Sequence, residues 1–313
     1  MSYPMDIPVL ILFGPTASGK TSLVFKLFSD SLSGAAELIS ADSMQVYRGM
    51  DIGTAKPSAE ERSQLAHHLI DIRNPDEQFN AGDFVRLADS ACVDIASRGK
   101  LPVVSGGTGF YINAVIYGTE FAPSENDTEN KLRQDFAILA EEKGALFLHD
   151  KLRHADPAAA AAIHPNNIKR VARALSYCKL TGKAFSAYNA VQKAKEPIFD
   201  TNFSVLTMPR EILYNRINQR TIAMWEAGLP DEVQNLFSKG YNLGLASMQG
   251  IGYKEAINFL QGRCTQAEAI NSIQQATRNY AKRQDTWFRN QSQNARTVNA
   301  DSKNPNDLAK EIK

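Results

Sequence analysis

Cysteine is scarce in this sequence, and long apolar segments are missing altogether. Cys92, Cys178 and Cys264 lie far apart, which provides neither a disulfide framework nor the ligand spacing of a zinc site. No apolar run reaches the roughly 18 residues of a membrane-spanning helix, and the first residues lack the basic segment of a signal peptide. We therefore expect a cytoplasmic protein without a membrane partner.

An excess of charge of either sign is also missing. The 313 residues carry 35 basic and 34 acidic side chains, with a formal net charge of +1. A strongly basic chain would indicate a polyanion partner through its composition alone. Here any nucleic-acid surface has to be a local patch, and the length leaves room for about two domains.

The most informative segment that is present is a phosphate loop. It follows the apolar run Val9–Phe13 and consists of Gly14, Pro15, Thr16, Ala17, Ser18, Gly19, Lys20 and Thr21. A loop of the pattern G-x-x-x-x-G-K-[ST] turns several backbone N–H groups toward one anion, while the Lys neutralises charge and the hydroxyl holds Mg²⁺. The alternative is an ordinary turn, which the strand before the loop and the helical pattern after it disfavour. The ligand is expected to carry a diphosphate or triphosphate.

Short apolar runs alternate with helical patterns through the first half of the chain. Strands are predicted at 9–13, 37–41, 68–72 and 101–105, and helices at 20–29, 82–98 and 108–116. Such alternation is typical of a parallel sheet with helices on both faces, so the predicted fold class is α/β with a P-loop core.

The second half divides into a helical insertion and a return to the core. A strand is predicted at 203–208, followed by helices near 210–227, 230–239, 247–260 and 265–289. Inserted domains enter at surface loops, so a helical insertion between two strands of the core would disturb the packing of the core little. The predicted domains are a catalytic core of 1–120 with 200–295, an all-helical insertion domain of 121–199, and a C-terminal tail of 296–313.

Two strand ends place polar side chains beside the phosphate loop. Asp42 follows the second strand and Thr108 follows the fourth, and ligands of open α/β sheets bind outside the carboxyl ends of the strands. Asp42 could accept a proton or bind Mg²⁺, and Thr108 could hold a substrate. A turn-capping Asp and a helix-capping Thr are the alternatives. The fourth strand ends in Ser105 where a P-loop kinase or ATPase would carry a Walker-B Asp, which disfavours nucleotide hydrolysis.

Two helices carry cationic faces. Residues 164–183 include five Lys and Arg and no Asp or Glu, and helical spacing puts Lys169, Arg170, Arg173 and Tyr177 opposite an apolar seam. The last long helix repeats this design with Arg278, Lys282 and Arg289. Two such faces suggest a bound phosphate backbone, although either alone is more often a solvated surface.

Further candidates lie in the last third of the chain. Arg216 and Arg220 stand one helical turn apart after the returning strand, where either can reach a diphosphate with its planar fork. Gln249–Lys254 combines glycines with an aromatic and a cation, as a loop touching nucleic acid would. The alternative is a helix N-terminus packed by Tyr253.

The ordered motifs resemble those of the tRNA dimethylallyltransferases, also called tRNA isopentenyltransferases, in their bacterial form. The likeness rests on Gly14–Thr21, Asp42–Pro57, His67–Ile72, Gly106–Tyr111, His164–Leu175, Thr181–Lys183, Gln249–Glu255 and Arg283–Arg289. It implies transfer of a dimethylallyl group from dimethylallyl diphosphate to the exocyclic amine of the adenine just 3′ of the anticodon, at position 37 of tRNA. The flipped base and the prenyl diphosphate are expected to enter one channel from opposite ends.

The resemblance also implies roles for residues of this chain. Asp42 would act as the general base on the amine, and Thr108 would help to hold it. The diphosphate would be bound by Lys20, by Arg216 or Arg220, and by Thr21 with Mg²⁺ as the cofactor. Contacts with the tRNA anticodon stem-loop are implied for Asp42, Ser43, Met44, Gln45, Thr108, Lys169, Arg170, Val171, Ala172, Arg173, Gln249, Gly250, Ile251, Gly252, Tyr253 and Lys254. We expect a monomer.

Three other interpretations stay open. A relative that prenylates free adenine nucleotides would share the loop and the base, but would not need a basic helical insertion. A small-molecule P-loop kinase would need the missing Walker-B acid and a cluster of lid arginines. A nucleotide-gated RNA-binding module would not need Asp42 and Thr108, so substitution of Asp42 separates it from the enzymes.

Overall fold

The computed structural model describes residues 7–28, 34–119, 127–291 and 295–300, which belong to two compact units. The core unit comprises 1–116 and 197–313, and the insertion unit comprises 117–196. These junctions lie within four residues of the boundaries expected from the sequence.

A six-stranded parallel sheet forms the centre of the core unit. The strands are β1 (Pro8–Phe13), β2 (Ala36–Ala41), β3 (His67–His68), β4 (Leu101–Gly106), β5 (Asp200–Thr207) and β6 (Arg296–Asn299). They lie in the order β3-β2-β4-β1-β5-β6, and every neighbouring pair is parallel. The sheet confirms the predicted α/β class, and β1, β2 and β4 begin and end within one residue of the predicted strands.

The third strand is shorter than the sequence predicts. A strand was expected at 68–72, but Leu69 and Asp71 adopt left-handed backbone conformations, with φ of 63° and 57°. Extended pairing cannot continue through such residues, so β3 ends at His68. The chain then follows the loop after β2, where the N–H groups of Ile72 and Arg73 both donate to the Val46 carbonyl at 2.9 Å.

The prediction of a C-terminal tail at 296–313 is wrong at its start. Arg296–Asn299 pairs in parallel with Ser204–Thr207 of β5 and forms the last strand of the sheet. Only Val298 of this strand is buried, so its four residues lack the alternating pattern from which a strand is recognised. Residues 301–313 lie outside the described part of the chain.

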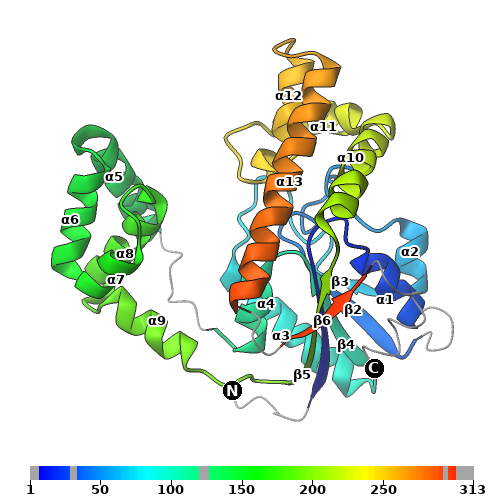
Figure 1. Cartoon of the computed structure of the whole chain (residues 1–313), viewed down its shortest axis with the longest axis horizontal. Helices are drawn as coiled ribbons and strands as arrows, with labels where there is room; N and C mark the ends of the chain where they lie inside the picture. The colour runs from blue at the N-terminus through cyan, green and yellow to red at the C-terminus, as the bar shows by residue number, and fades with distance from the viewer. Residues whose placement is uncertain (1–6, 29–33, 120–126, 292–294, 301–313) are drawn as a thin grey trace. The chain divides into compact units, whose positions relative to one another are not determined.

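Helices cover both faces of the sheet. The core unit contains α1 (Lys20–Phe28), α2 (Ala59–Gln64), α3 (Ala81–Ser97), α4 (Gly109–Ile116), α10 (Arg210–Glu226), α11 (Leu229–Ser238), α12 (Tyr253–Leu260) and α13 (Gln266–Gln291). Figure 1 shows α3 and α4 on one side of the sheet and α1 on the other. Leu23 and Leu27 of α1 pack against Leu10 and Leu12 of β1 in a buried cluster.

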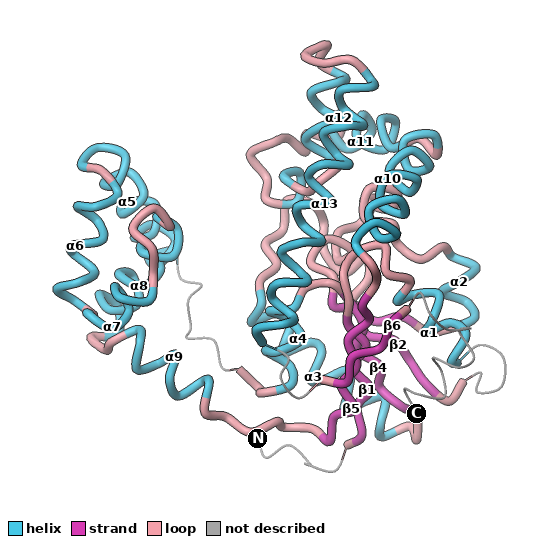
Figure 2. The backbone as a smooth tube through the Cα atoms, viewed as in Figure 1, coloured by secondary structure: helices cyan, strands magenta, loops and turns pink. Residues whose placement is uncertain are grey.

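Four helices stand together at one end of the sheet. Figures 1 and 2 show α10, α11, α12 and α13 gathered at the end where α10 follows β5. A second buried cluster joins Leu229 of α11, Ile257 of α12 and Ile273 of α13 to Met50 in the loop after β2. This packing brings long helices over the carboxyl ends of the strands, where the candidate site lies.

The described residues of the insertion unit form helices and connecting turns only. The helices are α5 (Asp127–Lys143), α6 (Ala145–Ala155), α7 (Pro157–Ala162), α8 (Ile168–Thr181) and α9 (Phe185–Lys193). Leu148 of α6 and Val171 of α8 share its buried core. Asp156 accepts from the Ala159 N–H at 3.0 Å, which caps α7, and from the N–H and hydroxyl of Ser186, which ties α9 to α7. The expectation of an all-helical insertion is confirmed.

Candidate active site

A cavity of about 340 Å³ opens at the carboxyl ends of β1 and β2, between α10 and α13. It is formed by the phosphate loop, the loop after β2, the segment before α12, and both helices. Its lining includes the predicted site residues Thr16, Ala17, Asp42, Ser43, Met44, Arg220, Gln249, Gly250, Ile251 and Tyr253. Segments far apart in the sequence thus converge at the position where open α/β sheets bind ligands.

Lys20 of the phosphate loop lies at the start of α1 and folds back over the loop. Its Nζ donates to the carbonyl oxygens of Gly14 and Pro15, both at 2.8 Å. Burial and the nearby Arg220 lower the pKa of Lys20 to about 7, although Asp42 acts in the opposite direction. Burial and Arg220 therefore favour the neutral form of Lys20. An anion bound in the loop would raise the pKa of Lys20 again and favour its charged form.

Two arginines of α10 approach the loop from different sides. A Cβ added to Gly19 would lie 3.8 Å from Nη1 of the exposed Arg216, so this guanidinium stands close to the loop. Arg220 lines the cavity, where burial lowers its pKa and Asp42 opposes the shift. The sequence left open which arginine faces a diphosphate, and the fold brings both of them to the loop.

Asp42 and Thr108 are fixed next to each other. Oδ1 of Asp42 accepts from the Met44 N–H at 2.9 Å, so the turn-capping interpretation is correct, yet the same side chain lines the cavity. The Thr108 hydroxyl accepts from the Ser43 N–H at 3.3 Å and lies near the Tyr280 hydroxyl, whose pKa it lowers. Backbone N–H groups thus orient both of the side chains for which the sequence predicts a chemical role.

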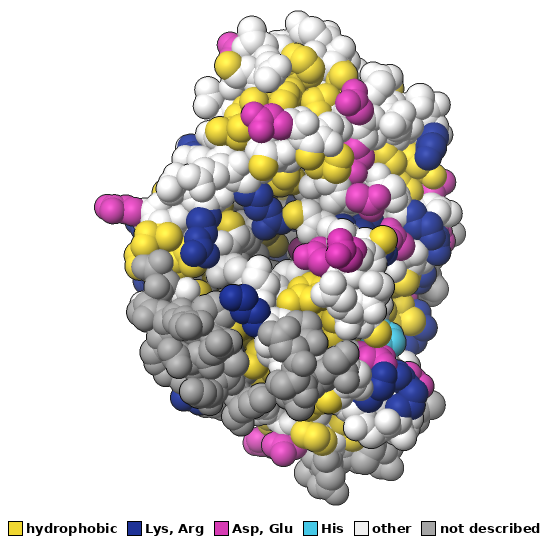
Figure 3. Space-filling view, turned by 90° about the vertical axis from the view of Figure 1, so that its right-hand side faces the viewer, with side chains coloured by type: hydrophobic (Ala, Val, Ile, Leu, Met, Phe, Trp, Pro, Cys, Tyr) yellow, Lys and Arg dark blue, Asp and Glu magenta, His cyan; other side chains and the backbone are white. Residues whose placement is uncertain are grey.

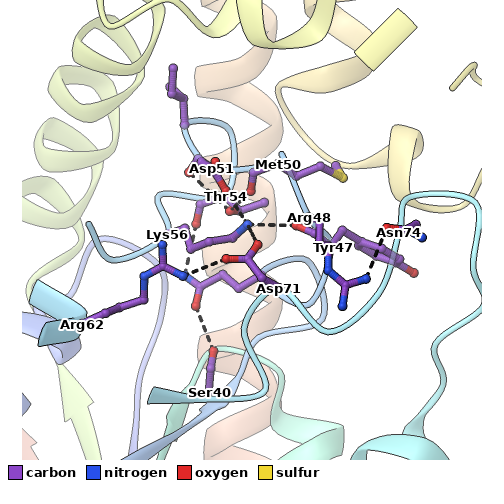
Figure 4. Close-up of polar contacts among 12 residues, drawn as sticks. Ser40, Tyr47, Arg48, Met50, Asp51, Thr54, Lys56, Arg62, Asp71 and Asn74 are labelled. Atoms are coloured by element: carbon purple, nitrogen blue, oxygen red, sulfur yellow. Dashed lines mark hydrogen bonds and ion pairs between the residues drawn. The ribbon is translucent and has the colours of Figure 1, made fainter. Parts of the chain in front are cut away.

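A buried lysine anchors the loop that carries Asp42. Lys56 Nζ donates to the Tyr47 carbonyl at 2.9 Å and pairs with the carboxylates of Asp51 and Asp71 at 2.5 and 2.6 Å (Figure 4). Only 2% of the Lys56 side chain is exposed. The side chains of Asp51 and Asp71 are 60% and 30% exposed, so the ion pairs are buried on the lysine side only. A buried cation that loses its partners is costly, so these contacts hold the loop that follows Asp42.

Three polar residues of the site were not predicted as site residues, although Gln284 lies in the motif Arg283–Arg289. Gln284 of α13 is buried and binds both the phosphate loop and the turn after β4. Tyr280, one turn earlier, lines the cavity, where burial and Asp42 raise its pKa to about 12. Glu232 of α11 accepts from three successive N–H groups of the loop after β2 and from the Tyr253 hydroxyl. Only tertiary contacts distinguish these residues from other polar side chains on helices.

The core residues expected to contact tRNA differ widely in exposure. The amide of Gln45 is used within the protein, because it accepts from the Ser40 hydroxyl at 2.8 Å and donates to two backbone carbonyls. Tyr253 is 1% exposed and Gly252 is buried, so the alternative of a packed helix start is correct there. Tyr253 nevertheless lines the cavity, as do Ser43, Met44, Gln249, Gly250 and Ile251, and Lys254 is exposed.

Helix α8 offers a smaller basic face than its sequence predicts. Lys169 and Arg170 are exposed, whereas Arg173 is half-buried, with its pKa lowered by burial. Val171 and Ala172 are buried in the core of the insertion unit. Their side chains therefore support the fold of the unit, and a tRNA contact at these two residues stays a prediction.

Charge is mixed on the surface of the protein. Figure 3 shows basic and acidic side chains interspersed on the face that it presents, in keeping with the net charge near zero. No helix within the described ranges is long and apolar enough to cross a membrane. The same residues contain no group of three or more His, Cys, Asp or Glu that could hold a metal ion.

The chain matches a known family along most of its length. A family model described as IPP transferase matches residues 45–291. The chain belongs to this family. It is 48% identical to the tRNA dimethylallyltransferase of Lachnoclostridium phytofermentans over 282 residues, which cover 90% of this chain and 88% of that protein.

Solved structures of IPP transferases agree with the fold. The tRNA isopentenylpyrophosphate transferase of Bacillus halodurans has a TM-score of 0.70 and 42% identity, over 98% of this chain and 94% of that one. A eukaryotic dimethylallyltransferase acting on tRNA has a TM-score of 0.80 and 28% identity, over 94% of this chain and 74% of that one. The resemblance inferred from the motifs is confirmed.

Proposed function

We propose that this protein transfers the dimethylallyl group of dimethylallyl diphosphate to the exocyclic amine of adenine 37 in tRNA. The observation that carries the proposal is that Asp42 and Arg220 line one cavity and both act electrostatically on Lys20 of the adjoining phosphate loop. A base beside an anion site is what attack of an amine on an allylic diphosphate requires. The bacterial relatives named tRNA dimethylallyltransferase support the same substrates.

In this reaction the amine nitrogen bonds to the allylic carbon, and the bond from that carbon to the diphosphate oxygen breaks. The electron pair leaves with the diphosphate, and the amine proton passes to Asp42. Because the Met44 N–H already occupies Oδ1, we assign the proton to Oδ2. Lys20 and Arg220 face the charge that grows on the leaving group, so the loop stabilises a departing diphosphate although no phosphoryl group moves.

Thr21 is the residue of this chain that fits Mg²⁺. Its hydroxyl is exposed at the start of α1, directly after Lys20, and a hydroxyl oxygen suits a hard cation. Bound there, Mg²⁺ would neutralise part of the diphosphate charge, with phosphate and water oxygens as its other ligands. Thr21 and Lys20 would then hold the diphosphate against the loop while Arg220 closes the cavity side.

Exposed residues at the cavity and on α8 are the proposed tRNA contacts. They include Gln249 and Lys254 on the core unit and Lys169 and Arg170 on the insertion unit. We also propose that a monomer acts on the tRNA and that the reaction takes place in the cytoplasm, in keeping with a tRNA substrate.

A competition between acceptors tests this function. Radiolabelled dimethylallyl diphosphate and Mg²⁺ are incubated with the protein, offering unmodified tRNA and AMP together. We expect label in tRNA and loss of that label in Asp42→Asn. Label in AMP would assign the protein to the nucleotide prenyltransferases, and label in neither acceptor would overturn prenyl transfer.

A further inference from the structure

The buried side chain of Gln284 bridges the phosphate loop and the turn after β4. It projects from α13 and is 5% exposed. Its Oε1 accepts from the Thr16 N–H of the phosphate loop at 2.9 Å, and its Nε2 donates to the Gly107 carbonyl oxygen at 2.7 Å. One amide thus connects the loop after β1 with the turn after β4.

The two backbone groups that Gln284 binds adjoin the proposed substrate sites. Thr16 belongs to the loop for the diphosphate, and Gly107 precedes Thr108, which lies beside Asp42. The Tyr280 hydroxyl lies near both Gln284 and Thr108, since both groups lower its pKa. A carboxamide suits this place because it accepts and donates from adjacent atoms without carrying charge.

The packing around this amide leaves little freedom. A Cβ added to Gly107 would lie 2.4 Å from Nε2 of Gln284, and a Cβ added to Gly109 would lie 2.3 Å from the ring of Trp287. Helix α13 is therefore pressed against the turn after β4. The separation between this turn and the phosphate loop then depends on the length and the hydrogen bonds of one side chain.

We propose that Gln284 is a positioning residue that fixes the distance between the phosphate loop and Thr108, and hence between the allylic diphosphate and the acceptor amine. This inference rests on the proposed function. Gln284 is not among the residues that line the cavity. Its loss should therefore lower kcat and diphosphate affinity while tRNA affinity stays unchanged.

The Gln284→Glu variant tests the inference because protonation rescues it. A carboxylate still accepts from the Thr16 N–H but cannot donate to Gly107, whereas the protonated carboxyl does both. Burial raises the pKa of such a group. Relative to wild type, kcat should fall about tenfold or more at about pH 8.5 and recover at about pH 6. The charged and titratable groups near these hydrogen bonds are Tyr280, with Asp42 and Arg283 around it, and Lys20 of the phosphate loop, with Arg220 and Asp42 around it. Dividing each variant rate by the wild-type rate at the same pH corrects for their titration.

Gln274→Glu is the matched control. Gln274 lies on the same helix, and its amide donates to the Asn218 carbonyl at 3.2 Å, away from the cavity lining. This variant should keep the wild-type rate throughout the pH series. A loss in Gln284→Glu that does not depend on pH, or an equal loss in both variants, would overturn the inference.

Calorimetric titration with inorganic diphosphate separates this inference from the proposed function. Relative to wild type, Gln284→Glu should bind diphosphate more weakly at about pH 8.5 and equally at about pH 6, and this result does not depend on turnover. If wild type transfers no label, the proposed function fails while the titration still decides the role of Gln284. Should Gln284→Glu not fold, Gln284→Met should lower kcat with tRNA affinity intact, and an equal loss of both would contradict a positioning role.

Discussion

The cavity of the core unit and the basic face of the insertion unit are built in opposite ways. The cavity brings Asp42 next to Tyr280 from near the other end of the chain, and buried hydrogen bonds of Gln284 hold the segments beside it. The basic face on α8 consists of the neighbouring residues Lys169 and Arg170, both exposed on one helix. A reaction that depends on a fixed geometry needs side chains from several elements to be held together in a buried site. Attraction of a phosphate backbone needs only accessible charged side chains.

This difference predicts how each region responds to change. A displaced base or cation in the cavity loses the alignment on which the reaction depends, so substitutions there should have sharp effects. Charges on an exposed face act nearly independently and are screened by salt, so substitutions there should have graded effects. Variants of the two regions can be ranked accordingly.

The largest effect is expected at Asp42. Asp42→Asn keeps the size of the side chain but removes the proposed base, and transfer should fall about 10²- to 10⁴-fold. Affinity for tRNA should stay within about twofold of wild type, since phosphate contacts supply most of it. Label transfer and filter binding measure the two quantities. Asp76→Asn, at an exposed position, provides the same change of charge as a control. Equal losses of rate and affinity would place Asp42 in binding rather than in chemistry.

Lys20→Ala should have the next largest effect. Transfer is expected to fall about 10²- to 10³-fold because the leaving group loses one of its cations, with tRNA binding largely intact. Since the pKa of Lys20 is lowered to about 7, diphosphate binding should raise it again. At about pH 8, wild type should take up more protons than the variant, by up to about one per diphosphate. Calorimetry in buffers of different ionisation enthalpy measures this uptake, and identical values for both proteins would contradict the assignment.

The same pKa shift has a sign that stability measurements can check. The folded-state pKa of Lys20 lies below the ordinary value of 10.5, so the unfolded chain binds more protons between these two values. Without diphosphate, the free energy of unfolding should therefore gain a contribution that rises with pH from about 7 to 10.5. Urea denaturation across this range should show a flatter curve for Lys20→Ala.

Consecutive motifs and strand ends were predictable from the sequence. Gly14–Thr21 carries its own loop geometry, and Asp42 is placed by the strand before it, because parallel strands end at the same edge of a sheet. The partners of Gln284 and Glu232 lie 268 and 181 residues away in the chain. No periodicity or spacing can indicate contacts over such separations, so these residues required the structure.

Errors in the predicted elements have the same physical origin. The strand Arg296–Asn299 exists because β5 offers it an edge, and its own sequence has no strand pattern. Tyr177 was expected on the basic face of α8, but its ring packs on Phe185 with centroids 5.6 Å apart. Helical spacing correctly separates the apolar face of a helix from its basic face. Whether a residue between the two faces is exposed depends on the helix that packs beside it.

An intermediate effect is expected at Glu232, which supports the cavity without taking part in the reaction. Its carboxylate accepts from the N–H groups of Asp51, Ile52 and Gly53 at 2.8, 2.7 and 3.1 Å, and from the Tyr253 hydroxyl at 2.8 Å. Glu232→Gln places an amide donor among these donors, so the free energy of unfolding should fall by about 1–3 kcal/mol. Urea denaturation measures the change. Glu226→Gln on exposed α10 surface should be neutral, and equal stability of both variants would show that the loop does not depend on Glu232.

The smallest effects are expected on the basic face of α8. The double variant Lys169→Ala with Arg170→Ala should lower tRNA affinity about tenfold, and the slope of log affinity against log salt should become shallower by about 0.7 to 0.9 for each phosphate that the variant no longer neutralises. At saturating tRNA, kcat should not change, because Asp42 and Lys20 are untouched. Lys131→Ala with Lys143→Ala on α5 removes the same charge from the same unit as a control. If both pairs lower the affinity equally, the unit attracts tRNA by its total charge, and α8 has no special place in recognition.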